Sequence, residues 1–247
     1  MGGNMSGNQE FKINSNKLND NQFYAEVSVW DPDVKEGRCG HASVKVYKSG
    51  EKKKETYLGS WPKYPSLVNL FTLPFPSPIK HLKSKEECMV RESSEDDKKL
   101  TPSRTFTIPL TQENYGAMKA KAASLKAQGK SGFGLYSLFA NANVLNLVRA
   151  ISKPSVVRQT YGVCPMSGLP IENPELENDI AGIRKFKVGH CSTTVEKVLK
   201  AGGVNIISSR LSPWRISPLG LANQLERMAA INPNIQVERG VCQLVAV

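Results

Sequence analysis

The sequence lacks any apolar run close to the roughly 20 residues that a helix needs to cross a lipid bilayer. Its first 20 residues are polar and do not contain the apolar core of a secretory signal peptide. We therefore expect a protein of the cytoplasm, or one that a signal-less secretion system exports into a host or target cell.

Cysteines are few and scattered. The chain contains five, and no two of them have the C-x-x-C spacing: Cys39, Cys88, Cys164, Cys191 and Cys242. An odd, dispersed set argues against a disulfide framework and against a zinc site. It indicates a protein that works in a reducing compartment, and we expect neither a metal nor a cofactor.

Aromatic residues make up only 7% of the chain and do not interleave with the lysine clusters behind its net charge of +11. The lysine clusters also lack arginine-rich runs, so we do not expect nucleic acid as a partner. A solvated basic face accounts for the charge. Such a face is also compatible with contact to an anionic membrane.

The chain has 247 residues, of which 40% are hydrophobic, and this is enough to bury a core. We expect a disordered tail over residues 1–20 and a single domain over residues 21–247. Within the domain, the charged stretch 80–103 predicts a long, exposed and mobile excursion. A second excursion, over residues 144–188, contains four prolines.

Period-two alternation of apolar residues predicts strands over Phe23–Trp30 and Gly40–Tyr47. A turn at residues 49–51 then leads to a partner strand over Glu55–Trp61, which makes an antiparallel hairpin. Val237–Val247 reads as a terminal strand. The fold class that we predict is α+β, with a small antiparallel sheet packed on the helix that carries Cys191.

Helix signals follow in the second half of the chain. Thr111 is a good N-cap for one helix, and the apolar stretch Leu135–Ile151 predicts another. A third helix begins at Cys191 and ends at Gly202, and a fourth covers Ser217–Met228. Residues 105–110 predict a short strand.

Two residues stand out as a candidate catalytic pair. A thiol at a helix N-terminus, as predicted for Cys191, is favoured in its thiolate form by free backbone N–H groups and the helix dipole. A histidine at the start of a strand, as predicted for His41, can act as the base that takes the thiol proton. The two are 191 − 41 = 150 residues apart, so only the fold can bring them together.

Each candidate also has a simpler interpretation. Cys191 can be a small buried apolar residue, as free cysteines often are. His190 adjoins Cys191, but neighbours at a helix start point in different directions, so we favour His41 as the base. His81 lies in the charged excursion and is expected to face solvent, and Cys39 is expected to be a loop thiol.

The chain resembles the circularly permuted papain-like (NlpC-like) cysteine hydrolases, in which the histidine strand precedes the cysteine helix. Four short segments carry this resemblance: Val29–Pro32, Gly40–Ser43, Tyr57–Pro62 and His190–Val195. Residues 108–115 and 136–138 resemble the toxin- or effector-like bacterial branch of the same superfamily. The resemblance implies a permuted papain-like domain and a catalytic role for Cys191 and His41.

The chain departs from the family pattern at two places. About fifty residues separate Tyr136 from Cys191, which suggests an inserted element. The third polar residue that orients the histidine falls near Gly59 or Ser60 in the family pattern. Glycine cannot do this, so Ser60 is the candidate.

The resemblance and the residue pair predict a hydrolase or acyl-transfer enzyme that acts on amide or isopeptide bonds through a Cys191 thioester. A protein or peptide is then the substrate, and the excursion over residues 144–188 restricts access to the cleft or docks a partner. Two alternatives stay open. One is an acyltransferase or phospholipase that acts on membrane lipids, and the other is a non-catalytic binding module with a decayed site, which Gly59 favours.

Overall fold

The structure is a computed structural model of the whole chain. It describes residues 22–33, 35, 38–51, 55–63, 76–93, 98–141, 145, 186–209, 212, 213, 215–240 and 244–246. The predicted tail over residues 1–20 lies outside the described residues, as does the excursion over residues 144–188 apart from residues 145 and 186–188.

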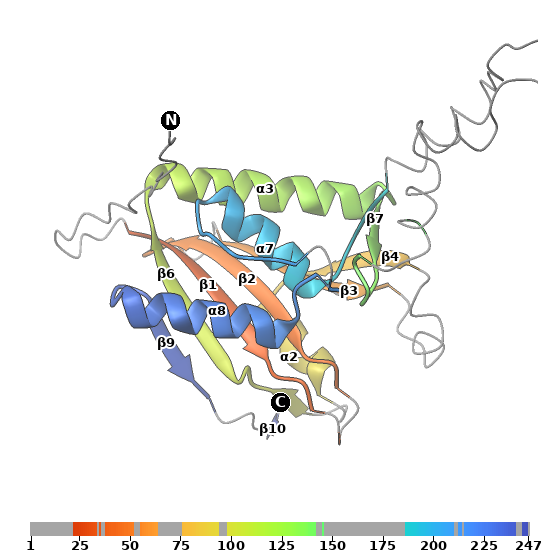
Figure 1. Ribbon diagram of the computed structural model, residues 1–247, viewed down its shortest axis with the longest axis horizontal. Helices are drawn as coiled ribbons and strands as arrows, with labels where there is room; N and C mark the ends of the chain where they lie inside the picture. The colour runs from red at the N-terminus through yellow and green to blue at the C-terminus, as the bar shows by residue number, and fades with distance from the viewer. Residues whose placement is uncertain are drawn as a thin grey trace, which may run out of the picture.

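A curled sheet of eight strands forms the centre of the molecule, with the order β8-β7-β4-β3-β2-β1-β6-β9 (Figure 1). All neighbouring strands are antiparallel except β7 and β8, which are parallel. The strands are β1 (Phe23–Trp30), β2 (His41–Lys48), β3 (Thr56–Pro62), β4 (Ser77–Leu82), β6 (Arg104–Leu110), β7 (Gly134–Tyr136), β8 (Lys187–Gly189) and β9 (Gln236–Arg239). The predicted α+β class is confirmed, but the sheet is larger than the small one that we predicted.

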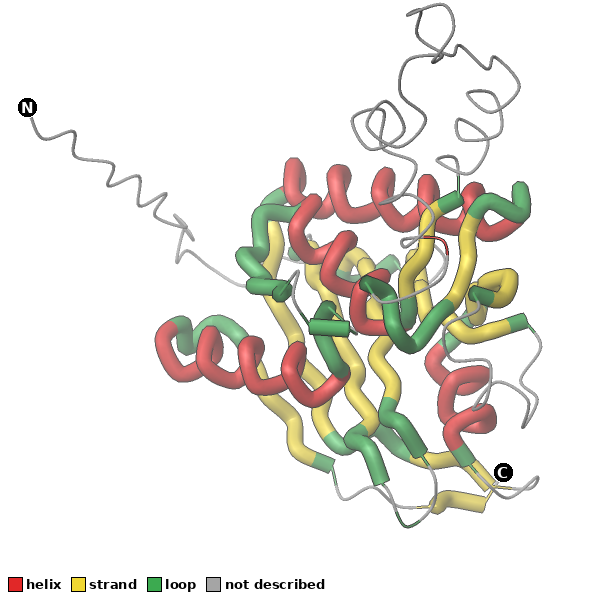
Figure 2. Tube along the Cα trace, turned by 45° about the vertical axis from the view of Figure 1, so that its right-hand side comes forward, coloured by secondary structure: helices red, strands yellow, loops and turns green. Residues whose placement is uncertain are grey.

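Four helices occur in the described part of the chain: α2 (Lys85–Glu92), α3 (Gln112–Lys130), α7 (Cys191–Ala201) and α8 (Pro218–Ile231). In Figure 1, α3, α7 and α8 cross the front of the sheet, and α2 lies behind it. The second view shows the strands between α2 and the other three helices (Figure 2). Among the described residues, we find no helix with the length and apolar character that a membrane span requires.

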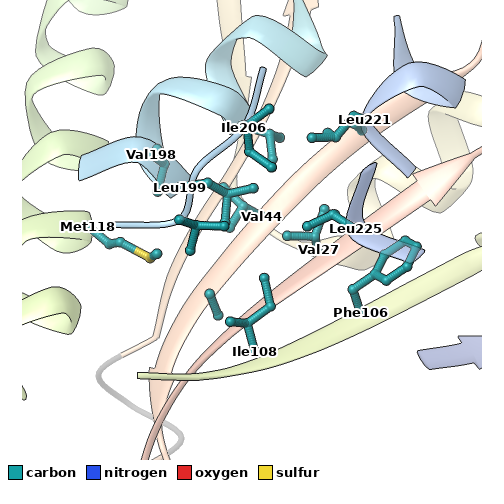
Figure 3. Packing of buried hydrophobic residues seen from close by; sticks show 14 of the residues in the cluster. Val27, Val44, Phe106, Ile108, Met118, Val198, Leu199, Ile206, Leu221 and Leu225 are labelled. Carbon is teal, nitrogen blue, oxygen red and sulfur yellow. The ribbon is translucent and has the colours of Figure 1, made fainter. Parts of the chain in front are cut away.

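The main core lies between the sheet and its three front helices (Figure 3). Strand alternation turns Val27 of β1 and Val44 of β2 toward this side, because residues two apart share a face. Leu199 of α7 and Leu225 of α8 pack on these strands, and all four side chains are fully buried. Hydrophobic burial thus fixes α7, and with it Cys191, against the central strands.

A second, smaller core lies on the other face of the sheet, under α2. It consists of Trp30, Tyr57, Leu82, Cys88 and Leu100. Helix α2 is capped by Ser84, whose hydroxyl accepts a hydrogen bond from the amide of Glu87. A short sheet of β5 (Lys98–Leu100) and β10 (Leu244–Ala246) adjoins it, and the indole of Trp30 donates a hydrogen bond to the Leu100 carbonyl.

The predicted excursion over residues 80–103 is therefore corrected, since this stretch forms the second half of β4, all of α2 and all of β5. The stretch was predicted to be exposed because of its many charged residues, but these lie on the outer face of an amphipathic helix. Cys88 and Glu92 point inward and are buried. The helix predicted over Leu135–Ile151 is also wrong at its start, where β7 pairs with β4 and β8.

The predicted C-terminal strand is split between the two sheets. Strand β9 pairs with β6 at the edge of the large sheet, and β10 pairs with β5 in the small one. The central hairpins agree with the sequence prediction, since β1 pairs with β2 and β2 pairs with β3, both antiparallel. The strand that begins with His41 precedes the helix that begins with Cys191 along the chain.

Candidate functional site

His41 is the first residue of β2 and lies opposite Trp30, the last residue of β1. Strand alternation places its side chain on the face covered by α2, whereas its neighbour Ala42 belongs to the main core. The imidazole is 2% exposed. The rings of Trp30 and Trp61 flank it at centroid distances of 5.6 and 5.3 Å, so His41 sits between two indoles that exclude water.

Both ring nitrogens of His41 face residues of α2. Nε2 lies 3.7 Å from Sγ of Cys88, and Nδ1 lies 3.5 Å from Oε1 of Glu92. Cys88 and Glu92 are four residues apart, so they project from the same side of the helix. One turn of α2 thus places a thiol and a carboxyl group against the two nitrogens of one imidazole.

Gly59 of β3 makes this approach possible. A Cβ atom at this position would lie 2.6 Å from Sγ of Cys88 and 3.6 Å from Nε2 of His41. The absent side chain therefore leaves the space that the Cys88 thiol occupies. Gly59 was the residue that favoured a decayed site, but its lack of a side chain is explained by the packing of Cys88 against it.

Ser60 does not contact His41, and its predicted role in orienting the imidazole is corrected. Its hydroxyl lies 3.0 Å from Nδ1 of His81, whose Nε2 contacts the Leu125 carbonyl of α3. Ser60 therefore points to the face of the sheet opposite His41, because adjacent strand residues alternate. Glu92 occupies the position beside Nδ1 that we had assigned to Ser60, and His81 is half-buried rather than facing solvent.

Cys191 is the first residue of α7, as predicted, and is 2% exposed. Burial raises the pKa of its thiol to about 11. The backbone of Ala42 and the hydroxyl of Ser192 act in the opposite sense and lower this pKa by hydrogen bonding to the sulfur. The Cys191 sulfur therefore lies against the backbone next to His41.

The same sulfur also interacts with Tyr136, the last residue of β7. Burial raises the pKa of Tyr136 well above its ordinary value, and the charge of Cys191 and a hydrogen bond to it add to the shift. The charge of Glu92 also raises the pKa values of Cys191, Cys88 and Tyr136. These effects place both thiols, the phenol and the His41–Glu92 pair in one buried cluster.

No hydrogen bond joins His41 to Cys191, although the structure describes both residues. The imidazole contact at Nε2 goes to Cys88, whose thiol is fully buried and whose pKa burial raises to about 12. Cys88 lies within α2 and has no helix N-terminus to stabilise a thiolate. Of the two thiols, Cys191 alone lies at a helix N-terminus.

The titration of the His41–Glu92 pair follows from its burial. Desolvation lowers the pKa of His41 to about 3, and the charge of His190 adds to this effect. Desolvation raises the pKa of Glu92 to about 8, against the lowering effect of Arg38. The pair therefore holds a single proton at neutral pH: Glu92 is protonated and the imidazole of His41 is neutral.

The remaining candidates are placed around this cluster. His190 is the N-cap of α7 and is 3% exposed, and its amide donates a hydrogen bond to the Thr193 hydroxyl at 2.7 Å. Cys39 is an exposed free cysteine of the loop before β2. His190 lies close enough to His41 for its charge to lower the pKa of the imidazole. The lower rank of His190 and Cys39 in the sequence analysis stays a prediction.

Sequence reasoning missed Glu92 and Cys88. The signal that identifies them is their spacing of four within the short segment Lys85–Glu92, which begins after a serine N-cap. The many charges around this segment concealed it.

Within the described ranges, no group of three histidine, cysteine, aspartate or glutamate side chains has an arrangement that would hold a metal ion. Comparison with known proteins gives no match to a protein-family model, to a curated protein or to a solved structure.

Proposed function

We propose that the protein is a thiol-dependent hydrolase or acyl-transfer enzyme that acts on amide or isopeptide bonds. Cys191 is the nucleophile, His41 is the base, and Glu92 orients His41. One observation carries this proposal: a thiol at a helix N-terminus and an imidazole–carboxyl pair converge in one buried cluster, from three elements far apart in sequence.

The proposed reaction starts with proton transfer from the Cys191 thiol to Nε2 of His41. The thiolate attacks the substrate carbonyl carbon, and the N-terminal amides of α7 stabilise the oxyanion that forms. When the tetrahedral intermediate collapses, His41 returns the proton to the leaving amine. Water or an acceptor amine then attacks the thioester and restores the free thiol.

Glu92 contributes through the charge that develops on His41. A neutral imidazole becomes an imidazolium in the first step, and the Glu92 carboxyl oxygen 3.5 Å from Nδ1 is an acceptor that stabilises that charge in a buried environment. The imidazole must also turn from Cys88 toward Cys191. This requirement is consistent with a resting state in which both thiols are protonated and buried.

A small activated ester tests the proposal without knowledge of the natural substrate. The protein is incubated with p-nitrophenyl acetate, nitrophenolate release is followed, and mass spectrometry locates the acetyl group. We expect acetylation of Cys191 that Cys191→Ala abolishes, and a loss on the order of 100-fold in His41→Asn. Cys88→Ala is the matched control, because it removes the other thiol of the cluster and should retain acetylation.

Exposed Cys39 is an internal reference for an unactivated thiol. If Cys191 is acetylated no faster than Cys39, the catalytic proposal fails. The non-catalytic binding module is then the better explanation, and the absence of a His41–Cys191 hydrogen bond is the observation that favours it.

The alternative of an enzyme that acts on membrane lipids is supported by the net charge of +11, which favours contact with an anionic membrane. Sedimentation with phosphatidylserine vesicles separates it from a peptide hydrolase. A peptide or isopeptide hydrolase stays in the supernatant, whereas co-sedimentation together with release of fatty acid would favour the lipid enzyme.

A further inference from the structure

Lys197 of α7 is a half-buried lysine that has no hydrogen-bond or ion-pair partner among the described residues, although its helix is packed between α3 and the sheet. An ammonium group in such a position is costly, because burial removes water that nothing replaces. The proposed reaction does not use this residue.

The Lys197 ammonium lies next to the chain that leads into the nucleophile. A Cβ atom at Gly189 would lie 3.6 Å from Nζ of Lys197 and 2.7 Å from Oγ1 of Thr193. Gly189 ends β8 and precedes Cys191 by two residues. The long side chain of Lys197 therefore runs back along α7 to the first turn of the helix.

Three further cations, from three other segments of the chain, lie close enough for their charges to act on Lys197. Burial and the positive charges of Arg215, Lys121 of α3 and Lys187 of β8 lower the pKa of Lys197 to about 8. Glu196 acts in the opposite sense but is already engaged. Its fully buried carboxylate accepts hydrogen bonds from Lys200 at 2.7 Å and from Ser208 at 2.8 Å, and it pairs with Arg215 at 3.2 Å.

We propose that Lys197, with Lys121, Lys187 and Arg215 around it, binds an anionic group, a carboxylate or a phosphate, of the substrate that Cys191 attacks. An anion would supply a partner that Lys197 lacks among the described residues, and it would offset the repulsion that the neighbouring positive charges exert on Lys197. A side chain at Gly189 would collide with the Thr193 hydroxyl, so the glycine lets the Lys197 ammonium and the first turn of α7 approach the chain before Cys191. The proposed function identifies the ligand as a substrate, but the binding itself does not depend on catalysis.

Sulfate and two peptides are the probes for this site. Thermal midpoints are measured against sulfate at constant ionic strength made up with chloride, and binding is calculated from the shift. We expect the apparent sulfate affinity of Lys197→Met to be about tenfold weaker than that of the unmodified protein. Lys130→Met is the matched control, because it removes the same charge from an exposed position at the end of α3 and should leave the sulfate effect unchanged.

The pH dependence provides a second readout. Sulfate does not titrate near neutrality, whereas Lys197 loses its proton around pH 8. Sulfate affinity should therefore fall between pH 7 and pH 9 in the unmodified protein, and this fall should be absent in Lys197→Met. Should Lys197→Met not fold, the Lys121→Met/Lys187→Met double variant replaces it, with weaker sulfate binding as the expected result.

A glutamyl peptide and its glutaminyl counterpart distinguish the sources of the anion. If the glutamyl peptide binds and the glutaminyl peptide does not, the anionic group is a carboxylate. If sulfate binds and the glutamyl peptide does not, the anionic group is a phosphoryl group. An equal sulfate effect in Lys197→Met and Lys130→Met, or no binding of any probe, would overturn the inference. Repeating the series in Cys191→Ala separates the two proposals, because a true anion site persists there even if Cys191 proves inert toward the ester.

Discussion

At the scale of single residues, the contact between His41 and Glu92 controls how the buried cluster responds to pH. In the folded protein the pair holds one proton between about pH 3 and pH 8, whereas in the unfolded chain the two groups titrate near 6.5 and 4.5. Between pH 4.5 and 6.5 both states hold one proton, so stability is flat there. Above pH 6.5 the folded state holds more protons than the unfolded chain, so stability falls as the pH rises. Below pH 4.5 the folded state holds fewer protons than the unfolded chain, so stability falls as the pH drops.

Glu92→Gln should remove the alkaline part of this profile. Without the carboxyl group, the folded state no longer retains a proton between pH 6.5 and pH 8, so the loss of about 2 kcal/mol over that interval should disappear. Urea unfolding at a series of pH values measures it. Glu238→Gln, on the exposed edge strand, should give a profile parallel to that of the unmodified protein. An undiminished loss in Glu92→Gln would show that Glu92 is ionised in the fold.

Gly59 allows a direct test of the thiol–imidazole contact. Gly59→Ala should destabilise the protein by about 1–3 kcal/mol, because the added methyl group meets the Cys88 sulfur at 2.6 Å. Most of this cost should vanish in a Cys88→Ala background, and a double-mutant cycle of unfolding free energies measures the coupling. Gly116→Ala is the control: nothing lies within 4 Å of its added methyl group in α3, so a gain of about 0.5–1 kcal/mol is expected. Simple additivity at Gly59 and Cys88 would contradict the packing.

The residues of the cluster differ in how far the sequence could reveal them. Cys191 and His41 carry local signals, a helix start and a strand start. The helix begins at Cys191 as predicted, and the strand begins at His41, one residue after the predicted start at Gly40. Glu92 depends on where α2 docks, which is decided by tertiary packing on Gly59 and the indoles. Ser60 was assigned to the wrong face because its strand position alone does not show which side of the sheet faces His41.

At the scale of elements, Glu196 anchors α7 to the segment that leads into α8. Its carboxylate has no exposed surface and bonds to Lys200, Ser208 and Arg215. We expect Glu196→Ala to lower the free energy of unfolding by about 1–3 kcal/mol, because several donors lose their acceptor. Chemical denaturation checks this value. Arg239→Ala should cost under about 0.5 kcal/mol, because that side chain is 75% exposed and its ion pair is screened by water. Equal costs would mean that the network around Glu196 adds no stability.

Helices and strands whose apolar residues recur with a clear period were predicted, and those whose apolar and charged residues are mixed were not. The apolar residues of β1 and β2 alternate in sequence, and Thr111 marks the start of α3 through a hydrogen bond from the amide of Asn114. Helix α2 is one of the shorter helices and is highly charged, so its single inward stripe does not stand out in sequence. Strand β7 has three residues and exists because β4 and β8 lie on either side of it.

At the scale of the whole molecule, the sheet has a well-paired centre and short edges. Strand β1 pairs along most of its length with β2 and with β6, whereas the four-residue β9 pairs on one side only in the described part of the chain. Native-state hydrogen exchange should therefore be slowest in β1 and β2 and faster by orders of magnitude in β9. Comparable protection in β9 and β1 would indicate that the edge strand is covered in solution.

The order of the site's parts along the chain has a consequence for its biosynthesis. The ribosome makes His41 and Glu92 long before Cys191, and the 150 residues between the first and the last take roughly 10–30 s to translate. Strand β9, which pairs beside β6, follows later still. During translation the histidine and the carboxyl group lack their thiol, so an unfinished chain cannot attack its neighbours. If the proposed chemistry is correct, activity begins only when the last third of the protein has folded onto the first.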